Sequence, residues 1–416
     1  MEYRELAVIG NGCAGLACIR ALRACGDKRP ILVLSDTRWP AYNPMLTTYF
    51  AGGKISREQM FLFGRNEDLR TKLDAEIWEG FRAADLDAEG RVIRDQTGRT
   101  VSYGQCLVAT GASPILPRTP GMTRQTVFFM RTMDDALRLR RRLEEQPPRS
   151  AAVIGASMVG VKVMELLHAR GCRVTLADLA PHILPGAASP ECAREMERRL
   201  ESGGVRLCLG VTVDRLEPDG TLVLSSGERL ESDLTVVCIG VRSNLDFLRP
   251  GQVETDRGLL VDEYMRTSAP GLYAAGDAAQ GRELLSGESM VIGLLANARR
   301  QGRTAGRNLA GVKTPYPGNV LHNITHFMDM EFLGAGSVRS YDQVRCMSRG
   351  DSFAQLFWTK GRLTGVNLLN GGAVAGPARQ ALFWQALRAG GQPPEIPDEQ
   401  NLLLRDLEKE LVQPWT

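Results

Sequence analysis

AAVIGASMVGVKVMELLHARGCRVTLAD, residues 151–178, has the pattern of a strand, a tight turn, a helix and a second strand. The turn begins at Gly155, the helix follows Gly160, and the second strand ends in Asp178. Such a unit binds a dinucleotide, because its turn brings the helix N-terminus up to the pyrophosphate and the terminal acid accepts from a ribose hydroxyl. We therefore expect a dinucleotide at this turn.

The middle position of the turn holds Ser157 where such turns usually have glycine. A serine narrows the space through which backbone approaches phosphate, but its hydroxyl could donate a hydrogen bond to a phosphate oxygen. The predicted binding residues of this unit are Gly155, Ser157, Met158, Val159, Gly160 and Asp178.

The chain carries an earlier unit of the same kind, LAVIGNGCAGLACIRALRACGDKRPILVLSD at residues 6–36. Gly10 permits the tight turn, Gly12 lets the backbone approach pyrophosphate, and Gly15 lets the helix pack on the strand. Asp36 ends the second strand and can accept from a ribose hydroxyl. The predicted binding residues are Gly10, Gly12, Cys13, Ala14, Gly15 and Asp36.

The composition is that of an ordinary globular protein, with 43% hydrophobic and 24% charged residues. The 416 residues suffice for roughly two or three domains with their own cores. A net charge of +3 is too small to indicate nucleic acid or a membrane surface as partner. The densest basic run, at 138–149, has acids beside it and is interpreted as a solvated helix face.

The sequence favours a cytoplasmic location. The first predicted strand begins close to Met1, so we expect no signal peptide. No stretch reaches the roughly 18 uninterrupted apolar residues of a membrane span. Nine cysteines, scattered through predicted strands and helices, fit free thiols in a reducing compartment better than a disulfide framework.

Three further strands end in turns that can carry chemistry. QCLVATGASP (105–114) and LTVVCIGVRSN (234–244) are apolar strands that end in glycine turns, and such turns carry a chain from one domain into another. GLYAAGDAA (271–279) delivers Asp277 into a turn ahead of a long predicted helix. Asp277 is therefore placed to bind a sugar-like hydroxyl chain, or to cap that helix. Thr110, Gly111, Gly240 and Asp277 are the predicted site residues here.

These motifs resemble, in order and spacing, the flavoprotein reductases with two dinucleotide-binding domains, the pyridine nucleotide-disulfide oxidoreductase fold. That group includes rubredoxin and ferredoxin reductases, NADH oxidases and the flavin part of NADH-nitrite reductase. The resemblance covers about residues 1–315. It implies FAD on the first unit, NAD(P)H on the second, and Asp277 beside the ribityl or pyrophosphate part of FAD.

The resemblance also implies an α/β fold with a discontinuous FAD domain. That domain would comprise residues 1–112 and 243–316, with the NAD(H)-binding domain at 113–242 between them. Residues 317–416 would form a small α+β interface domain whose amphipathic tail ends the chain. Core docking is the favoured role of that tail, and binding of a partner is the alternative.

The redox thiols of the disulfide-reducing branches are missing. Cys13 and Cys18 have C-x₄-C spacing, but on one helix they would lie about 140° apart around the axis, too far for a disulfide. Aligning AYNPMLTTYFAGGKI (41–55) with the single-cysteine branch puts Met45 where the thiol would be. An acceptor would then be reduced by the flavin itself.

Lys162 stands two places after the last glycine of the second unit, where the family usually has glutamate. Two interpretations stay open. Lys162 reaches the junction of flavin and nicotinamide, where it is a candidate catalytic residue that stabilises reduced flavin. Alternatively it forms a surface pair with Glu165 at i, i+3, worth about 0.2–0.5 kcal/mol.

His322 and His326 are spaced to share one face of a helix, but no third ligand is evident nearby, so no metal site is assigned. The favoured function is an FAD-dependent NADH oxidoreductase that passes electrons to an iron–sulfur or other redox protein or subunit. It would act as a homodimer or within a hetero-complex. The alternatives are the flavoprotein subunit of a dehydrogenase that oxidises a small organic substrate, and a redox sensor or assembly subunit with little turnover.

Overall fold

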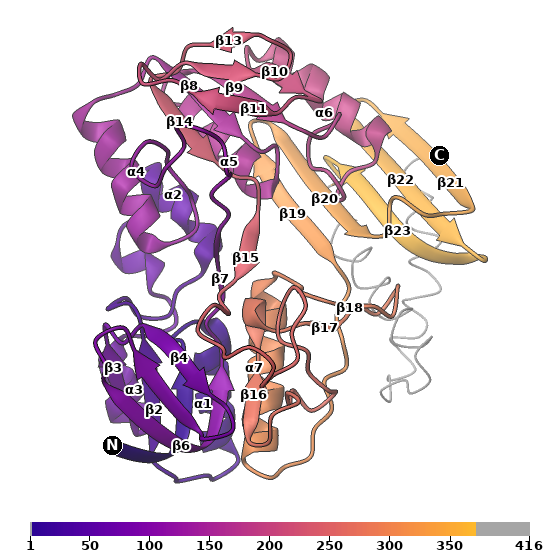
Figure 1. Cartoon of the computed structure of the whole chain (residues 1–416). Coiled ribbons are helices and arrows are strands. Elements are labelled where there is room, and N and C mark those ends of the chain that lie inside the picture. The colour runs from indigo at the N-terminus through magenta and orange to yellow at the C-terminus, as the bar shows by residue number, and fades with distance from the viewer. Residues whose placement is uncertain (1, 372–416) are drawn as a thin grey trace.

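The computed structural model describes residues 2–371. Figure 1 shows a mixed sheet with its helices at the bottom, a second sheet with its helices at the top, and a C-terminal sheet beside the upper unit. Both the lower and the upper sheet contain parallel strands, so the predicted α/β class is confirmed.

The lower sheet is built from two distant parts of the chain. Its path is β3-β2-β1-β6-β5-β4, and β16 pairs with β6 in parallel. The strands are β1 (Glu2–Ile9), β2 (Ile31–Ser35), β3 (Ala75–Glu79), β4 (Ala83–Asp87), β5 (Val92–Asp95), β6 (Thr100–Val108) and β16 (Leu272–Ala274). Strand β16 therefore returns beside β6 after the whole upper unit has been completed.

Helices α1 (Cys13–Ala24), α3 (Asn66–Leu73) and α7 (Leu295–Leu309) belong to this lower unit. Helices α1 and α7 cross at very short range because α7 carries Gly302 and Gly306 at the crossing. A Cβ on Gly302 would lie 2.1 Å from the carbonyl oxygen of Ala14, and one on Gly306 would lie 2.3 Å from that of Cys18. No side chain fits at either position.

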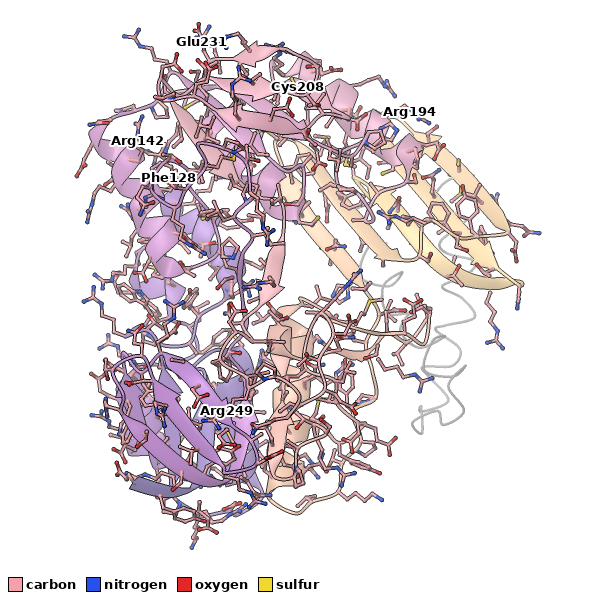
Figure 2. All side chains as sticks on the ribbon, viewed as in Figure 1. Phe128, Arg142, Arg194, Cys208, Glu231 and Arg249 are labelled. Carbon is pink, nitrogen blue, oxygen red and sulfur yellow. The ribbon has the colours of Figure 1, made fainter. Side chains whose placement is uncertain are left out.

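An arginine ties the returning segment to the lower sheet. Arg249, which is labelled in Figure 2, contacts Asp85 through Nε and Asp87 through Nη1, both at 2.8 Å. Beside these ion pairs, Leu248 forms a parallel bridge to Leu86 of β4. The segment that follows the upper unit is thereby fixed to the meander β4–β5.

The upper sheet is parallel, in the order β10-β9-β8-β14. Its strands are β8 (Ser150–Ile154), β9 (Arg173–Asp178), β10 (Arg206–Leu209) and β14 (Leu234–Val237), and its helices are α4 (Met133–Glu145), α5 (Met158–His168) and α6 (Pro190–Ser202). A separate antiparallel meander consists of β11 (Val213–Leu216), β12 (Leu222–Leu224) and β13 (Arg229–Leu230). Helix α2 (Thr47–Ala51) comes from the N-terminal part of the chain but packs against α4 and α5.

The chain passes between the two units along a pair of antiparallel strands, β7 (Ala112–Pro114) and β15 (Val241–Ser243). Thr110 and Asn244 reinforce this crossing, because Oγ1 of Thr110 donates to the carbonyl of Asn244 and Nδ2 of Asn244 donates to that of Thr110. We propose the domain limits stated above, 1–112 with 243–316 and 113–242, on the basis of this paired crossing.

The described C-terminal part is an antiparallel sheet in the order β19-β20-β23-β22-β21. The strands are β19 (His322–Phe327), β20 (Met330–Gly336), β21 (Gln343–Arg349), β22 (Ser352–Thr359) and β23 (Arg362–Leu369); the short strands β17 (Gly281–Arg282) and β18 (Ser289–Met290) precede them. The amphipathic tail predicted around Leu402–Leu411 lies outside the described residues.

The helical interpretation of His322 and His326 is wrong, because both lie on β19. A strand rises about 3.3 Å per residue, so positions four apart are separated by about 13 Å and cannot share one metal ion. Among residues 2–371, no group of three or more His, Cys, Asp or Glu side chains is arranged to hold a metal. Within the same range, no helix is long and apolar enough to cross a membrane.

Candidate functional site

The first glycine turn packs tightly against the end of β6, and only one of its three glycines has free space where a side chain would stand. Gly10 has φ +111°, and a Cβ on it would lie 2.2 Å from the carbonyl oxygen of Ala109 at the end of β6. A Cβ on Gly15 would lie 2.3 Å from the carbonyl oxygen of Gly10. A Cβ on Gly12, by contrast, would meet no atom within 4 Å. Protein packing therefore demands Gly10 and Gly15 but not Gly12.

This open position fits a phosphate-bearing cofactor. Helix α1 has no side-chain cap at its N-terminus, so the first backbone N–H groups, beginning with those of Cys13 and Ala14, are free to bind an anion. At the end of β2, Asp36 is exposed, and no other residue among 2–371 hydrogen-bonds to its carboxylate. A pyrophosphate over Gly12 and a ribose at Asp36 would match both features, as FAD requires.

Asp277 follows β16 and lies within the same region, but it does not cap the long helix. Helix α7 begins at Leu295 with Leu294 at its N-cap position, far along the chain from Asp277. Instead, Asp277 accepts a hydrogen bond from Nη2 of Arg131 at 2.5 Å. The helix-cap alternative for Asp277 is therefore wrong.

Arg131 is a site residue that the sequence analysis missed. It comes from the segment just before α4, and its Nε also donates to the carbonyl of Ala112 at 3.2 Å. The available signal was the T-x-x-D capping box of α4, formed by Thr132 and Asp135, which fixes the residue in front of it. Arg131 and Asp277 together place one charge of each sign beside the predicted cofactor position.

The second glycine turn packs in the same way but has a different middle residue. A Cβ on Gly155 would lie 2.5 Å from the carbonyl oxygen of Cys238 at the end of β14, and one on Gly160 would lie 1.9 Å from that of Gly155. The hydroxyl of Ser157 donates to the carbonyl of Cys238 at 2.8 Å and accepts from the N–H of Gly160. The one proton of the Ser157 hydroxyl is therefore already donated within the protein. Hydrogen bonds to a phosphate would have to come from the backbone N–H groups.

The remaining predicted nucleotide residues surround this turn. Met158 and Val159 form the half-buried first residues of α5. The carboxylate of Asp178 accepts from the N–H of Ala156 at 2.6 Å and from that of Ala180 at 2.7 Å, so it is held in place with lone pairs left for a ribose. Gly240 has φ +120° and forms the turn between β14 and β15.

No reactive thiol lies at the flavin side of the site. Met45, which the family resemblance aligns with the thiol of the single-cysteine branch, is 52% exposed. Burial raises the pKa of the Cys13 thiol to about 11, even though Arg299 favours the thiolate. Burial also raises the pKa of Cys18, and all nine cysteines are free. Because the thiolate is the nucleophile, neither cysteine of α1 is fit for thiol exchange at neutral pH.

Lys162 is buried, and it joins three parts of the chain. Its Nζ contacts the carboxylate of Glu165 and the backbone carbonyl of His326 on β19, and it lies 5.1 Å from the centre of the Tyr49 ring on α2. The pair with Glu165 therefore exists, but its predicted place at the surface is wrong. The catalytic role of Lys162 stays a prediction, and the adjacent carboxylate offsets much of the field that Lys162 would exert on a flavin.

Comparison with known proteins decides the family. Residues 4–302 match the family model described as pyridine nucleotide-disulphide oxidoreductase. The chain belongs to this family. It is an FAD-containing oxidoreductase that uses NADH.

Three relatives illustrate the range of partners in this group. The epsilon subunit of NADH-dependent phenylglyoxylate dehydrogenase from Aromatoleum evansii is 32% identical over 392 residues, covering 90% of this chain and 91% of that protein. Rubredoxin-NAD(+) reductase of Pseudomonas putida is 28% identical, covering 82% and 88%. The crystal structure of a ferredoxin reductase from Rhodopseudomonas palustris is 27% identical with a TM-score of 0.80, covering 88% and 91%.

Because Gly12 has free space around it, a substitution there should abolish FAD binding without preventing folding. Gly12→Val should fold like the parent apoprotein, because its Cβ meets no protein atom within 4 Å, but should purify without FAD. Absorbance at the flavin band and far-UV circular dichroism measure the two properties. Gly15→Val is the matched control and should fail to fold, because its Cβ overlaps a carbonyl oxygen. A yellow Gly12→Val protein with a full complement of FAD would contradict this assignment.

The carboxylate of Asp178 predicts a preference for NADH over NADPH. A 2′-phosphate beside it would be repelled by about 1–4 kcal/mol at ~4 Å, so kcat/KM should favour NADH by at least about tenfold. Asp178→Asn should reduce this ratio while keeping an acceptor for the N–H of Ala156. Equal kcat/KM for the two nucleotides in the parent protein would refute the prediction.

The contacts of Lys162 predict a structural cost. Lys162→Met leaves Glu165 charged and half-buried, so the free energy of unfolding should fall by about 2–3 kcal/mol in urea titrations. Adding Glu165→Gln should restore most of the loss, because the charge is removed while an acceptor for the N–H of Met328 is kept. A flavin midpoint potential that falls by tens of millivolts in Lys162→Met, without loss of stability, would instead support the catalytic role.

Proposed function

We propose that the protein transfers electrons between NADH and a redox protein, an iron–sulfur protein or subunit, with FAD as the only internal relay. The observation that carries this proposal is Met45, which stands exposed where a related branch has a thiol, with no thiolate-forming cysteine on the neighbouring helix α1. An acceptor that needs a thiol relay is therefore excluded on chemical grounds.

The two glycine turns divide the work between cofactor and substrate. FAD, when bound, would take two electrons from the nicotinamide and release them one at a time to two molecules of a one-electron acceptor. On the first unit, Gly12, the N-terminus of α1 and Asp36 would hold the pyrophosphate and ribose of FAD. On the second, the N-terminus of α5 and Asp178 would hold NADH. Arg131 and Asp277 would fix the sugar-phosphate chain of FAD between the two units.

A second candidate is a flavoprotein subunit of a dehydrogenase for a small organic substrate. It is supported by the 32% identity with the epsilon subunit of a phenylglyoxylate dehydrogenase over almost the full length of both chains. In that case another subunit would oxidise the substrate, and this chain would pass the electrons to NAD⁺. Both candidates require an electron-exchanging protein partner, so they differ mainly in the direction of flow.

We propose the cytoplasm as the location, because nine free cysteines fit a reducing compartment. We also propose that the protein works as a homodimer or within a hetero-complex. The subunit designation of the Aromatoleum relative supports a hetero-complex.

The acceptor is tested by separating the two half-reactions. Stopped-flow mixing with NADH should bleach the flavin quickly, and the reduced protein should then reduce rubredoxin or a [2Fe–2S] ferredoxin. Glutathione disulfide and coenzyme A disulfide should be reduced at negligible rates, because no thiol relay is present. Release of thiol at the rate of NADH consumption would refute the absence of a relay, and a flavin that NADH does not bleach would refute the whole proposal.

A further inference from the structure

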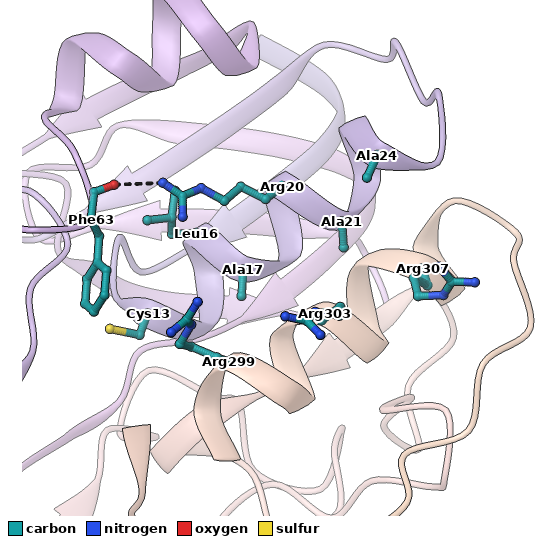
Figure 3. A pocket seen from close by; sticks show the side chains of 10 residues that line it. All are labelled: Cys13, Leu16, Ala17, Arg20, Ala21, Ala24, Phe63, Arg299, Arg303 and Arg307. Atoms are coloured by element: carbon teal, nitrogen blue, oxygen red, sulfur yellow. Dashed lines mark hydrogen bonds between the residues drawn. The ribbon is translucent and has the colours of Figure 1, made fainter. Parts of the chain in front are cut away.

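The side of the lower unit carries a groove between α1 and α7 with a volume of about 270 Å³. Figure 3 shows the arginines of α7 directed along the same side as the alanines of α1. Four of the ten lining residues are arginines and none is acidic. The lining residues are Cys13, Leu16, Ala17, Arg20, Ala21, Ala24, Phe63, Arg299, Arg303 and Arg307.

The arginines of α7 form an evenly spaced row. Arg299, Arg303 and Arg307 follow one another at intervals of four residues, so they share a helix face and span about 12 Å. Arg299 and Arg303 are exposed, and neither has an ion-pair partner among residues 2–371. Within residues 2–371, Arg299 lies 5.7 Å from the centre of the Phe63 ring, and Nε of Arg307 donates to Oγ1 of Thr314 at 2.9 Å.

The α1 side of the groove, called its floor here, is mostly apolar. Ala17, Ala21 and Ala24 present methyl groups to it, and α7 lies close because Gly302 and Gly306 allow the short helix crossing. A small-molecule site needs a few polar groups that fix the orientation of its ligand. Here the charged groups that line the groove are all arginines on long side chains, and the alanines of the floor offer no such group.

The position of the groove connects it with electron transfer. It begins at Cys13, the first residue of α1, where the proposed FAD pyrophosphate lies. Arg299 acts on Cys13 electrostatically, together with Asp277 and Arg131 of the predicted cofactor site. A protein lying along the row would therefore have one end beside the cofactor.

We propose that the groove between α1 and α7 docks an acidic segment of the electron-exchanging partner protein, with carboxylates set against Arg299, Arg303 and Arg307. The inference rests on the function proposed above. Carboxylates repeated every four residues on a partner helix would match the rise of the arginine row, and the guanidinium fork suits carboxylate geometry. The apolar floor would receive side chains from the same partner face.

The test uses the FAD-loaded full chain and a fluorescein-labelled helical peptide with glutamate at every fourth position. Fluorescence anisotropy should show binding at low ionic strength, and salt should weaken it because the contacts are exposed. Arg299→Glu with Arg303→Glu should raise the Kd by about tenfold or more. The matched control, Arg141→Glu with Arg173→Glu, changes the net charge equally at exposed positions of the upper unit and should leave the Kd near that of the parent.

The outcomes are distinct. If both double variants lose the same peptide affinity, or if neither loses any, the proposal that the groove docks the partner is overturned. ADP and inorganic pyrophosphate are tested in the same way. If either binds the parent more tightly than the peptide does, and only the α7 variant loses that binding, the groove is a site for a phosphorylated small ligand and the proposal is overturned. Stopped-flow reduction of the flavin by NADH is measured on the parent protein, and its failure there counts against the proposed function and not against the docking surface.

If the parent reduces rubredoxin or ferredoxin, the α7 double variant should also differ from the parent and from the control variant in steady-state turnover with that protein. Its KM for that protein should rise by about tenfold or more, with kcat little changed, since docking and not flavin chemistry is weakened. An unchanged KM would contradict the proposal even if the peptide binds.

Discussion

Two carbonyl oxygens, one at the end of β6 and one at the end of β14, occupy the space where side chains of Gly10 and Gly155 would stand. Each contact presses a glycine turn against the neighbouring strand and so fixes where the following helix begins. The second glycine contact in each unit brings the helix back onto its own turn. The N-termini of α1 and α5 are therefore held above the ends of their sheets before any ligand is bound, and every proposed binding contact depends on that placement.

The two turns differ in how completely they are satisfied without ligand. Helix α1 has no side-chain cap, and the space over Gly12 is empty of protein atoms. Helix α5 is capped by Ser157, whose hydroxyl also holds the end of β14. A cofactor at the first turn would supply hydrogen-bond partners that the protein itself does not provide. A nucleotide at the second turn would supply fewer, because Ser157 already caps that helix. This asymmetry suits a resident cofactor on the first unit and an exchanging one on the second.

The sequence was sufficient for the α/β fold and for the glycine turns, because these depend on local spacing of glycines, apolar runs and terminal acids. It was sufficient for Asp277 but not for its partner Arg131, because the two residues are 146 positions apart and meet only when the two units come together. His322 and His326 were placed on the wrong element because a spacing of four suits one face of a helix and equally one face of a strand. One of the two interpretations of Lys162 put it at the surface, because nothing in the sequence of its own helix indicates that β19 covers it.

The paired strands β7 and β15 have a consequence for how such a protein can be assembled. They run side by side, so the two ends of the proposed NADH-binding segment are neighbours, and the remaining chain needs little change of path to connect across them. A segment whose ends meet can be exchanged for another without stretching its host.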